Sequence, residues 1–380
     1  MPPRLLIITA AFGEGHNSAA RNLGLALDAR GATTRVADPC KLGAPFSTNL
    51  LGHAYRLVTT YSPQLWARIY RSTDRQDFSR QRMPFMRKPE NCLGEMVEEF
   101  QADAVISTYP LYPYFLERIF KKTGRPVPVF TVVTDSIEIN SAWLKAPTDH
   151  WLVTDPATRE SMIRSGLPAS RVIDTGFPVN PIFSRLEPVD ANDPCDPFRV
   201  LFFPTAKLVR RIGRALLEAS PKVKLTIVLG RNVRLLWRRA KELRTAYPGR
   251  VRIIGWTKRV PELLNSHHLI VGKAGGATVH EAIAARCPML IHHLVPGQEE
   301  GNLRLLESIG AGSLACSPAV IRAATADLLA DGGSRWRQMK QALVRHGRNA
   351  GALHAAHYIL DTLAQTMPPT PAPASDDLSL

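Results

Sequence analysis

The strongest constraint on the fold is a strand–loop–helix rhythm near the N-terminus that begins again in the second half. Residues 5–10 are a continuous apolar run, which is typical of a strand buried on both faces. Residues 17–30 then place apolar side chains at helical spacing, and residues 34–37 predict a second strand. Because a strand–helix–strand succession builds a parallel sheet covered by helices, we expect an α/β fold.

A segment rich in Pro, Asp and Asn at residues 187–197 separates two halves of similar size. Further strands are predicted at 104–107, 127–133, 151–153 and 171–175 before this segment, and at 199–203, 224–229, 251–254, 269–271 and 288–292 after it. Helices are expected at 207–219, 319–330 and 334–365. A chain of 380 residues has room for two domains. We therefore predict domains at 1–182 and 183–366, followed by a disordered, proline-rich tail at 367–380.

Composition narrows the partners and the compartment. The net charge of +15 favours an anionic partner, either nucleic acid, an anionic membrane face or a phosphorylated substrate, although a basic surface without such a role is equally compatible. The five cysteines include no CxxC pair, which argues against a disulfide framework or a structural zinc site and fits a reducing compartment. The N-terminus resembles a buried strand rather than a signal peptide. No segment approaches the ~20 apolar residues of a membrane-spanning helix, so any membrane contact is expected to be peripheral.

The glycine loop after residue 271 carries the clearest functional pattern. A strand at 269–271 runs into Lys273, Gly275 and Gly276, and a helix begins near Thr278. Paired glycines allow a backbone to approach a ligand closely, and a helix N-terminus offers unpaired N–H groups with a positive dipole end. The combination predicts an anion site suited to a pyrophosphate.

Polar residues beyond that loop extend the candidate site. Glu281, in the first turns of the same helix, can accept hydrogen bonds from ribose hydroxyls, although a carboxylate at a helix start also has a purely structural explanation. Gln298, Glu299 and Asn302 follow the next strand, at the edge of the sheet where open α/β folds bind ligands. They are candidates for contacts with sugar hydroxyls, but an ordinary polar loop would look the same.

Two N-terminal motifs are less specific. Residues 11–20 join the first strand to the first helix, but Ser18 stands where a dinucleotide fingerprint has its third glycine, and Asp38 is a weak match for its acidic partner. A dinucleotide site is therefore disfavoured. His16 lies in this loop, and Asp135 ends the strand within residues 132–136, VVTDS.

Together these motifs resemble a known enzyme family. GKAGGATVHEA followed by PMLIHHLVPGQEEGN is similar to the C-terminal signature of monogalactosyldiacylglycerol synthases and processive diacylglycerol glucosyltransferases. The lipid-linked N-acetylglucosaminyltransferase of peptidoglycan synthesis is a more distant relative. The loop at residues 11–20 resembles the family's GGGHxxSA signature, and TGFPVNPIF resembles its interdomain segment. The resemblance implies a GT-B fold, in which two Rossmann-like domains with parallel sheets face each other across a cleft.

The resemblance also implies roles for the residues that match its motifs. Glycines and the helix start bind the diphosphate of a UDP-sugar, the helical glutamate binds the ribose, and the GQE loop binds the sugar. These roles fall on Gly275, Gly276, Thr278, Glu281, Gln298 and Glu299. His16 becomes the general base, which suits an imidazole whose pKa is ordinarily near neutrality. Asp135 either orients His16 or holds an acceptor hydroxyl.

One motif departs from the family. Where relatives have a glycine-rich loop after the first strand of the second domain, residues 203–207 read FPTAK. Thr205 and Lys207 are candidates for replacement phosphate contacts. A changed donor or a weaker activity is the alternative.

The expected reaction is transfer of a hexosyl group from a UDP-sugar to a lipid acceptor, most simply diacylglycerol. The sugar nucleotide is a substrate, so no cofactor is expected. Fixed N–H donors and nearby cations would stabilise the charge that develops on the leaving diphosphate. Since the sequence contains no DxD pair, we predict an inverting reaction that needs no metal.

Residues 46–89 interrupt the α/β rhythm with many arginines and aromatic residues, where the family has a membrane-facing acceptor region. Arginines attract anionic headgroups at about 1 kcal/mol each, and apolar side chains enter the interface. Trp66, Arg68, Arg71 and Arg75 are the predicted membrane contacts, and an ordinary solvated helical insertion is the alternative. The expected location is cytoplasmic, on the inner face of the cell membrane.

Two other functions remain open at this stage. A UDP-N-acetylglucosamine 2-epimerase has the same fold but no lipid acceptor, so residues 46–89 argue against it. A nucleic-acid binder is suggested only by charge, and neither zinc-finger spacing nor an RNA-recognition signature is present, so no nucleic-acid partner is expected.

Overall fold

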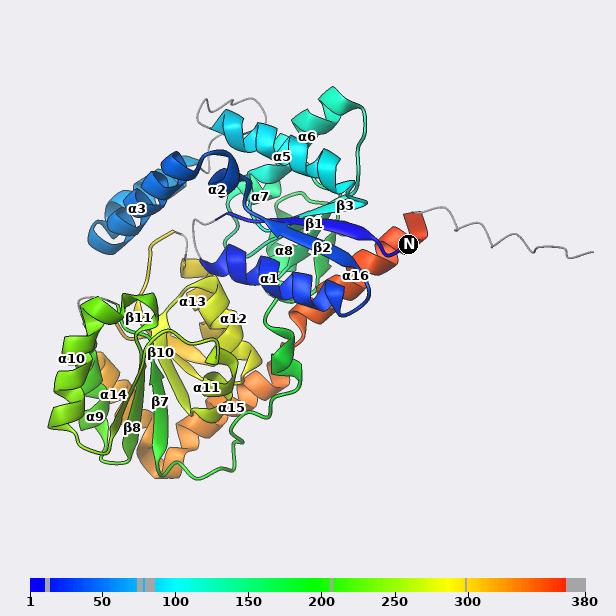
Figure 1. Ribbon diagram of the computed structural model, residues 1–380. Helices are drawn as coiled ribbons and strands as arrows, with labels where there is room; N and C mark the ends of the chain where they lie inside the picture. The colour runs from blue at the N-terminus through cyan, green and yellow to red at the C-terminus, as the bar shows by residue number, and fades with distance from the viewer. Residues whose placement is uncertain (11–13, 74–77, 79–85, 206–207, 298, 367–380) are drawn as a thin grey trace, which may run out of the picture.

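Two α/β units make up the computed structural model, one above the other in Figure 1. The structure describes residues 1–10, 14–73, 78, 86–205, 208–297 and 299–366. The predicted tail at 367–380 lies outside these residues. Two six-stranded sheets form the centres of the two units. Both predicted α/β halves are thereby confirmed.

The first sheet has the strand order β2-β1-β3-β4-β5-β6, and every pairing in it is parallel. Its strands are β1 (Arg4–Ile8), β2 (Thr33–Ala37), β3 (Ala104–Ser107), β4 (Val129–Val132), β5 (His150–Val153) and β6 (Val172–Asp174). In β1, Leu5 and Ile7 pack on one face of the sheet, whereas Leu6 and Ile8 pack on the other. This alternation explains the continuous apolar run in the sequence.

The helices of the first unit are α1 (Glu14–Asp28), α2 (Pro39–Gly43), α3 (Pro45–Tyr61), α4 (Pro63–Thr73), α5 (Arg87–Phe100), α6 (Tyr112–Thr123), α7 (Ser141–Leu144) and α8 (Pro156–Arg164). Helix α3 extends away from the sheet, on the side where the second unit lies (Figure 1). Helices α3 and α4 cover most of the predicted membrane-facing segment. No helix among the described residues is long and apolar enough to span a bilayer.

The second sheet has the order β12-β11-β10-β7-β8-β9, again with every pairing parallel. Its strands are β7 (Phe198–Phe202), β8 (Val223–Val228), β9 (Val251–Ile254), β10 (Leu269–Lys273), β11 (Met289–His293) and β12 (Gly312–Leu314). The strand β12 was not predicted. Its helices are α9 (Val209–Ala219), α10 (Val233–Ala246), α11 (Val260–Ser266), α12 (Gly276–Ala284), α13 (Glu300–Ile309), α14 (Pro318–Leu329) and α15 (Ser334–His346).

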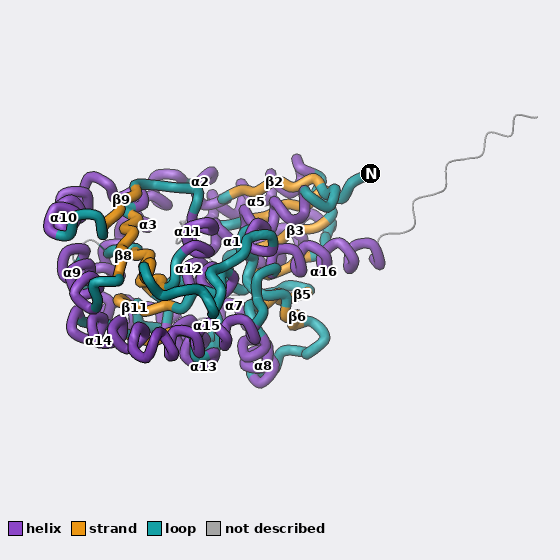
Figure 2. Tube along the Cα trace, turned by 90° about the horizontal axis from the view of Figure 1, so that it is seen from below, coloured by secondary structure: helices purple, strands orange, loops and turns teal. Residues whose placement is uncertain are grey.

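The chain returns to the first unit at its C-terminal end. Helix α16 (Gly351–Thr366) crosses over and packs against α1, as Figures 1 and 2 both show. Its apolar residues, including Ala355, Ala356 and Ile359, join Leu5 and Ile7 of β1 in one core. The predicted domain at 183–366 therefore needs correction, because α16 belongs by packing to the first unit.

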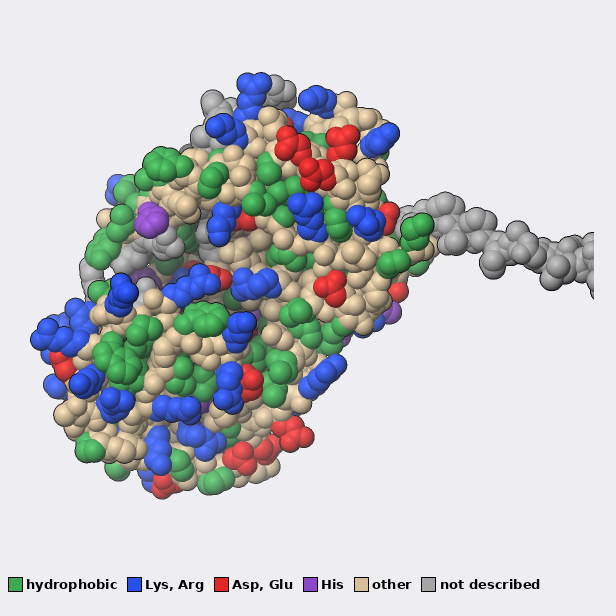
Figure 3. All heavy atoms as spheres, in the orientation of Figure 1, with side chains coloured by type: hydrophobic (Ala, Val, Ile, Leu, Met, Phe, Trp, Pro, Cys, Tyr) green, Lys and Arg blue, Asp and Glu red, His purple; other side chains and the backbone are tan. Residues whose placement is uncertain are grey.

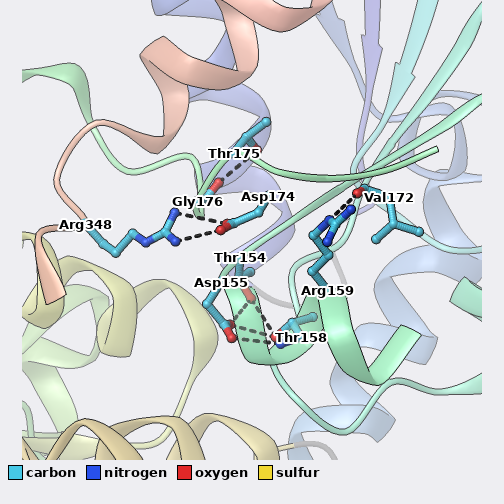
Figure 4. Close-up of polar contacts among 9 residues, drawn as sticks. All are labelled: Thr154, Asp155, Thr158, Arg159, Val172, Asp174, Thr175, Gly176 and Arg348. Carbon is cyan, nitrogen blue, oxygen red and sulfur yellow. Dashed lines mark hydrogen bonds and ion pairs between the residues drawn. The ribbon is translucent and has the colours of Figure 1, made fainter. Parts of the chain in front are cut away.

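The crossing also corrects the predicted helix at 334–365. Gly347 closes α15 in the left-handed conformation, and residues 347–350 are not helical. In this segment Arg348 forms two hydrogen bonds to the Asp174 carboxylate, of 3.0 and 2.6 Å (Figure 4). This partly buried pair joins the end of β6 to the crossing segment.

Candidate active site

The N-terminus of α12 has the features of an anion site. Strand β10 leads into it, and its N-cap residue, Gly275, has no side chain that could bond to the free N–H groups of the first turn. Gly275, Gly276 and Thr278 are all partly exposed. The first turn therefore offers backbone donors and the positive dipole end to a ligand.

The backbone of Gly276 closely approaches the first unit of the protein, whereas the sequence predicted a close approach to a ligand. A Cβ atom at this position would lie 2.8 Å from the backbone carbonyl oxygen of Thr134, which follows β4 in the first unit. A Cβ on Gly301, at the start of α13, would overlap the carbonyl oxygen of Ser136. Backbone atoms cannot yield as side chains do. These glycines thus allow the two units to meet.

Glu281 lies one turn further along α12 and is partly exposed. Burial raises the pKa of its carboxyl to about 7, and the positive charge of Arg21 on α1 opposes this shift. No donor among the described residues hydrogen-bonds to this carboxylate, so it retains its capacity to accept bonds from a ligand. The predicted ribose contact remains compatible with this position.

Lys273 and Glu299 form an ion pair beside the same helix start, with 3.1 Å between Nζ and Oε1. The Glu299 carboxylate raises the pKa of Lys273, which therefore remains a cation. The other oxygen of Glu299 accepts a hydrogen bond from the backbone N–H of Val295 at 3.0 Å. Glu299 is thus held by protein groups, and its predicted contact with a sugar hydroxyl remains a prediction.

Asn302 is buried behind the helix start. Its amide nitrogen donates to the carbonyl oxygen of Ala274 at 3.0 Å, while its side-chain oxygen has no hydrogen-bond partner among the described residues. Its neighbour in the predicted set, Gln298, lies outside the described residues. Thr205 is partly exposed after β7, and Lys207 lies outside the described part.

His16 lies in the first turn of α1, the helix that contacts α12 of the second unit. Its Nδ1 atom lies 3.0 Å from the hydroxyl of Thr134, and its ring packs edge-on against Tyr109. Desolvation lowers the pKa of His16 to about 4. The imidazole is therefore neutral near pH 7, in the form that can accept a proton.

Asp135 does not take the predicted place beside His16. Its Oδ2 atom accepts a hydrogen bond from the indole N–H of Trp143 at 2.8 Å, and burial raises the pKa of its carboxyl to about 6. The ring of Trp143 also lies near His16, with 6.0 Å between the two ring centroids. Among the described residues, Thr134 is thus the side chain that orients His16.

A polar chain connects the two units behind this site. The hydroxyl of Ser136 lies 3.0 Å from His280 Nε2 of α12 and 3.0 Å from the hydroxyl of Thr154. Thr154 in turn donates to Asp155 at 2.6 Å (Figure 4). The ring of His280 stacks on Phe177, with 4.7 Å between their centroids. This chain of polar groups has no sequence signal, because only the fold brings its members together.

A cavity of about 700 Å³ opens where the two units and α4 meet. Its walls come from α4, the segment after β4, the loop before α13, and α13 itself. Tyr70 and Arg71 of α4 line it together with Glu138 and Gly297. A Cβ on Gly297 would lie 3.1 Å from the Tyr70 ring, so α4 contacts the GQE loop directly.

Three of the four predicted membrane contacts lie on α4, and the fourth lies outside the described residues. Arg68 and Arg71 are exposed on α4, and the Nε of Arg71 donates to the carbonyl oxygen of Ala67. Trp66 is partly exposed and packs edge-on against Tyr55 of α3. Arg75 lies outside the described residues.

Two further observations concern cysteines and metals. All five cysteines are free thiols. Within the part of the chain that the structure describes, no three His, Cys, Asp or Glu side chains gather as metal ligands would.

Comparison with known proteins extends the family resemblance along the chain. The model of the monogalactosyldiacylglycerol (MGDG) synthase family matches residues 16–179. The processive diacylglycerol β-glucosyltransferase of Bacillus subtilis strain 168 is 26% identical over 356 residues, covering 91% of this chain and 92% of the relative. The same enzyme of Bacillus cytotoxicus is 26% identical over 368 residues, with 94% of both chains covered.

Solved structures agree with the fold. MurG of Acinetobacter baumannii superposes with a TM-score of 0.62 at 16% identity, covering 95% of this chain and all of that one. MnaA of S. aureus, solved with UDP, gives a TM-score of 0.63 at 14% identity, covering 97% and 99% of the two chains. The predicted GT-B fold is thereby confirmed. Residues 16–179 match the model of the monogalactosyldiacylglycerol synthase family, and the chain is an enzyme of the glycosyltransferase class with the GT-B fold.

Proposed function

We propose that this enzyme transfers a hexosyl group from a UDP-sugar to the free hydroxyl of diacylglycerol at a membrane surface. The Bacillus relatives, named as processive diacylglycerol β-glucosyltransferases, support the lipid acceptor. The structure of MnaA with UDP supports a uridine nucleotide as the ligand of this fold.

One juxtaposition supports the proposal most strongly. Helices α1 and α12 begin side by side where the two units meet, and a Cβ on Gly15 would lie 3.9 Å from the backbone nitrogen of Ala277. The candidate base, His16, therefore stands next to the uncapped first turn of α12. A glycosyl transfer needs this proximity, because the acceptor hydroxyl and the leaving diphosphate react at the same anomeric carbon.

Each group then has a chemical task. The neutral imidazole of His16 removes the proton of the acceptor hydroxyl, and the Thr134 hydroxyl fixes the ring through Nδ1. The hydroxyl oxygen attacks the anomeric carbon as the bond to the diphosphate breaks. The N–H groups of α12 and the ammonium of Lys273 stabilise the charge that builds up on the leaving UDP. Glu281 holds the ribose, and Asp135 holds the acceptor.

We further propose a single displacement that needs no metal ion, so that an α-linked donor gives a β-linked glycolipid. The reaction is placed on the cytoplasmic face of the membrane, where the five free cysteines would stay reduced.

The test is incubation with a panel of UDP-sugars and diacylglycerol in detergent micelles, followed by mass spectrometry of the lipid and proton NMR of the anomeric centre. The proposal predicts one β-linked hexosyl lipid. An α-linked product would reject single displacement. Conversion of UDP-N-acetylglucosamine to its C2 epimer without any lipid product would reject the transferase and favour the epimerase.

A further inference from the structure

Helix α10 has an outer face that no part of the site described above uses. Its buried stripe consists of Leu236, Ala240 and Leu243, which pack into the core of the second unit. Arg234, Arg238 and Lys241 repeat at the same helical spacing on the opposite side and are exposed. Helix geometry therefore presents three cations in one row to solvent.

Large apolar side chains flank this basic row. Leu235 is 58% exposed on one side of it and Trp237 is 41% exposed on the other. Trp256, in the loop after β9, is 56% exposed. A Cβ on the preceding residue, Gly255, would lie 3.4 Å from Val233, one turn before Trp237, so the two tryptophans border the same edge of α10.

The neighbouring helix α9 adds to the positive charge. Arg210 and Arg211 of α9 line a cavity of about 830 Å³ together with Arg234, Arg238 and Leu235 of α10. Glu242, the acid of this cavity, bonds to Arg210 at 3.4 Å and lies 3.6 Å from Arg238. One carboxylate thus faces several guanidinium groups, and Figure 3 shows Lys and Arg side chains gathered over α9 and α10 with apolar side chains among them.

The surface formed by α10 lies on the same side of the molecule as α3 and begins near the contact between the two units. Helices α3 and α10 lie on the same side of the molecule in Figures 1 and 2, one in each unit. Arg231, just before α10, lies 4.0 Å from Glu14 at the start of α1, so α10 begins where the two units meet. Helix α3 exposes Phe46, Leu50 and Leu57 on its own unit.

We propose that the α10 surface, defined as Arg234, Leu235, Trp237, Arg238, Lys241 and Trp256, binds anionic phospholipid headgroups. The guanidinium groups pair with lipid phosphates, while the leucine and tryptophans enter the interfacial layer. Both units then contact one bilayer, from α3 on the first and α10 on the second, with the cleft opening between them. A nucleic acid could pair with the cations, but an exposed leucine flanked by arginines would add nothing to its binding. Base stacking would also require the tryptophans to line a groove.

The test is co-sedimentation with vesicles of phosphatidylcholine, alone or mixed with phosphatidylglycerol. Wild type should bind the mixed vesicles, and added NaCl should weaken binding because salt screens the headgroup charge. Arg234→Glu/Arg238→Glu should lower partitioning by about tenfold or more, since each basic residue near an anionic surface contributes about a factor of five. Trp237→Ala/Trp256→Ala should also lower it, with less dependence on phosphatidylglycerol.

A matched control carries the same charge change elsewhere. Arg125→Glu/Arg164→Glu, after α6 and at the end of α8, reverses two exposed arginines and should leave vesicle binding near wild type. Transfer to diacylglycerol in detergent micelles should be equal in all variants. An equal loss of vesicle binding in the control pair would show that net charge alone explains the effect, and it would overturn the proposal.

Two other outcomes would also overturn it. The first is unchanged vesicle binding in the α10 variants. The second is binding of labelled single-stranded RNA that the α10 reversal abolishes while vesicle binding persists. Because sedimentation needs no donor sugar, a wild type that binds vesicles through α10 but transfers no sugar would refute the proposed function and leave this inference standing.

Discussion

Thr134 serves both units at once. Its side chain holds the imidazole of His16, and its carbonyl oxygen faces the space that a Cβ at Gly276 would fill. The hydroxyl acts on the ring without touching a substrate in the proposed reaction, so Thr134 is a positioning residue. Its contribution can be separated from that of the base itself.

Thr134→Val keeps the shape of the side chain but removes the hydrogen bond to His16. We expect kcat to fall about fivefold, which corresponds to about 1 kcal/mol for one neutral hydrogen bond, while KM for the UDP-sugar stays unchanged. His16→Ala should reduce kcat by about a hundredfold or more with UDP binding intact. Steady-state kinetics on both variants checks this split, and a raised donor KM in Thr134→Val would instead mean that the residue shapes the donor site.

Glu281 should make the affinity for the sugar-nucleotide donor depend on pH. Its pKa of about 7 lies above the ordinary range of a carboxyl group, so the group gains a proton as the pH falls through 7. Since the carboxylate is the form that accepts two hydrogen bonds from ribose, donor affinity should rise with pH over about one unit on either side of 7. Titrations with a UDP-sugar check this, because its diphosphate diester carries no group that titrates in the range.

Glu281→Gln is the matched control, since the amide fills the same space without titrating. Its donor affinity should be lower and flat across the same range. A pH dependence that survives in this variant would assign it to another group, such as Asp135.

At the level of elements, the contact between the segment after β4 and the starts of α12 and α13 sets how closely the units approach. A Cβ on Gly301 meets backbone atoms of Ser136 and Glu138, which have no room to move aside. Gly301→Ala should therefore hold the units apart, break the bond between Ser136 and His280, and lower transfer activity. Small-angle scattering should show a larger radius of gyration than wild type, whereas an unchanged radius with full activity would contradict this role.

The packing of α16 makes a separate prediction about stability. Ile359 is fully buried in the core that α16 shares with β1 and α1. Ile359→Ala should reduce the free energy of unfolding by about 2–4 kcal/mol, because it removes buried methyl groups and leaves a cavity. Urea unfolding followed by circular dichroism measures the change. A loss below 1 kcal/mol would mean that α16 docks only loosely on the first unit.

Elements with a strong local signal could be predicted from the sequence. The apolar runs of β1, β3, β10 and β11 mark strands buried on both faces, and parallel topology follows from the helices between them. The packing of α16 on the first unit could not be predicted, because the pattern of an amphipathic helix does not indicate which sheet the helix covers. The short strand β12 has only three residues and lacks a pattern of its own.

The same distinction applies to the site. The strands of a parallel sheet end at one edge, so motif and topology together predict that the segments after β1 and β4 meet, and Thr134, next to Asp135, does lie beside His16. The partners of His16 and Asp135 depend on side-chain conformations. Thr134 takes the place by His16 that the prediction gave to Asp135, and Lys273 engages the carboxylate of Glu299.

At the scale of the whole molecule, the proposed reaction uses three surfaces. The start of α12 is the proposed donor site, the cavity beside α4 opens next to the GQE loop, and α3 and α10 lie on one side of the molecule, one in each unit. A lipid hydroxyl held at the bilayer would then reach His16 without leaving the interface. The proposed roles of the base and of the membrane contacts both depend on the donor site, because no sugar can be transferred unless a sugar nucleotide binds there.

The most direct test of that dependence is calorimetric titration of a UDP-sugar into wild type and Glu281→Ala, without lipid. We predict saturable binding to wild type at one site per chain. Glu281→Ala should weaken it by about tenfold or more, the cost of two hydrogen bonds to a charged acceptor. Equal affinity in the two proteins, or no binding to wild type, would contradict the account.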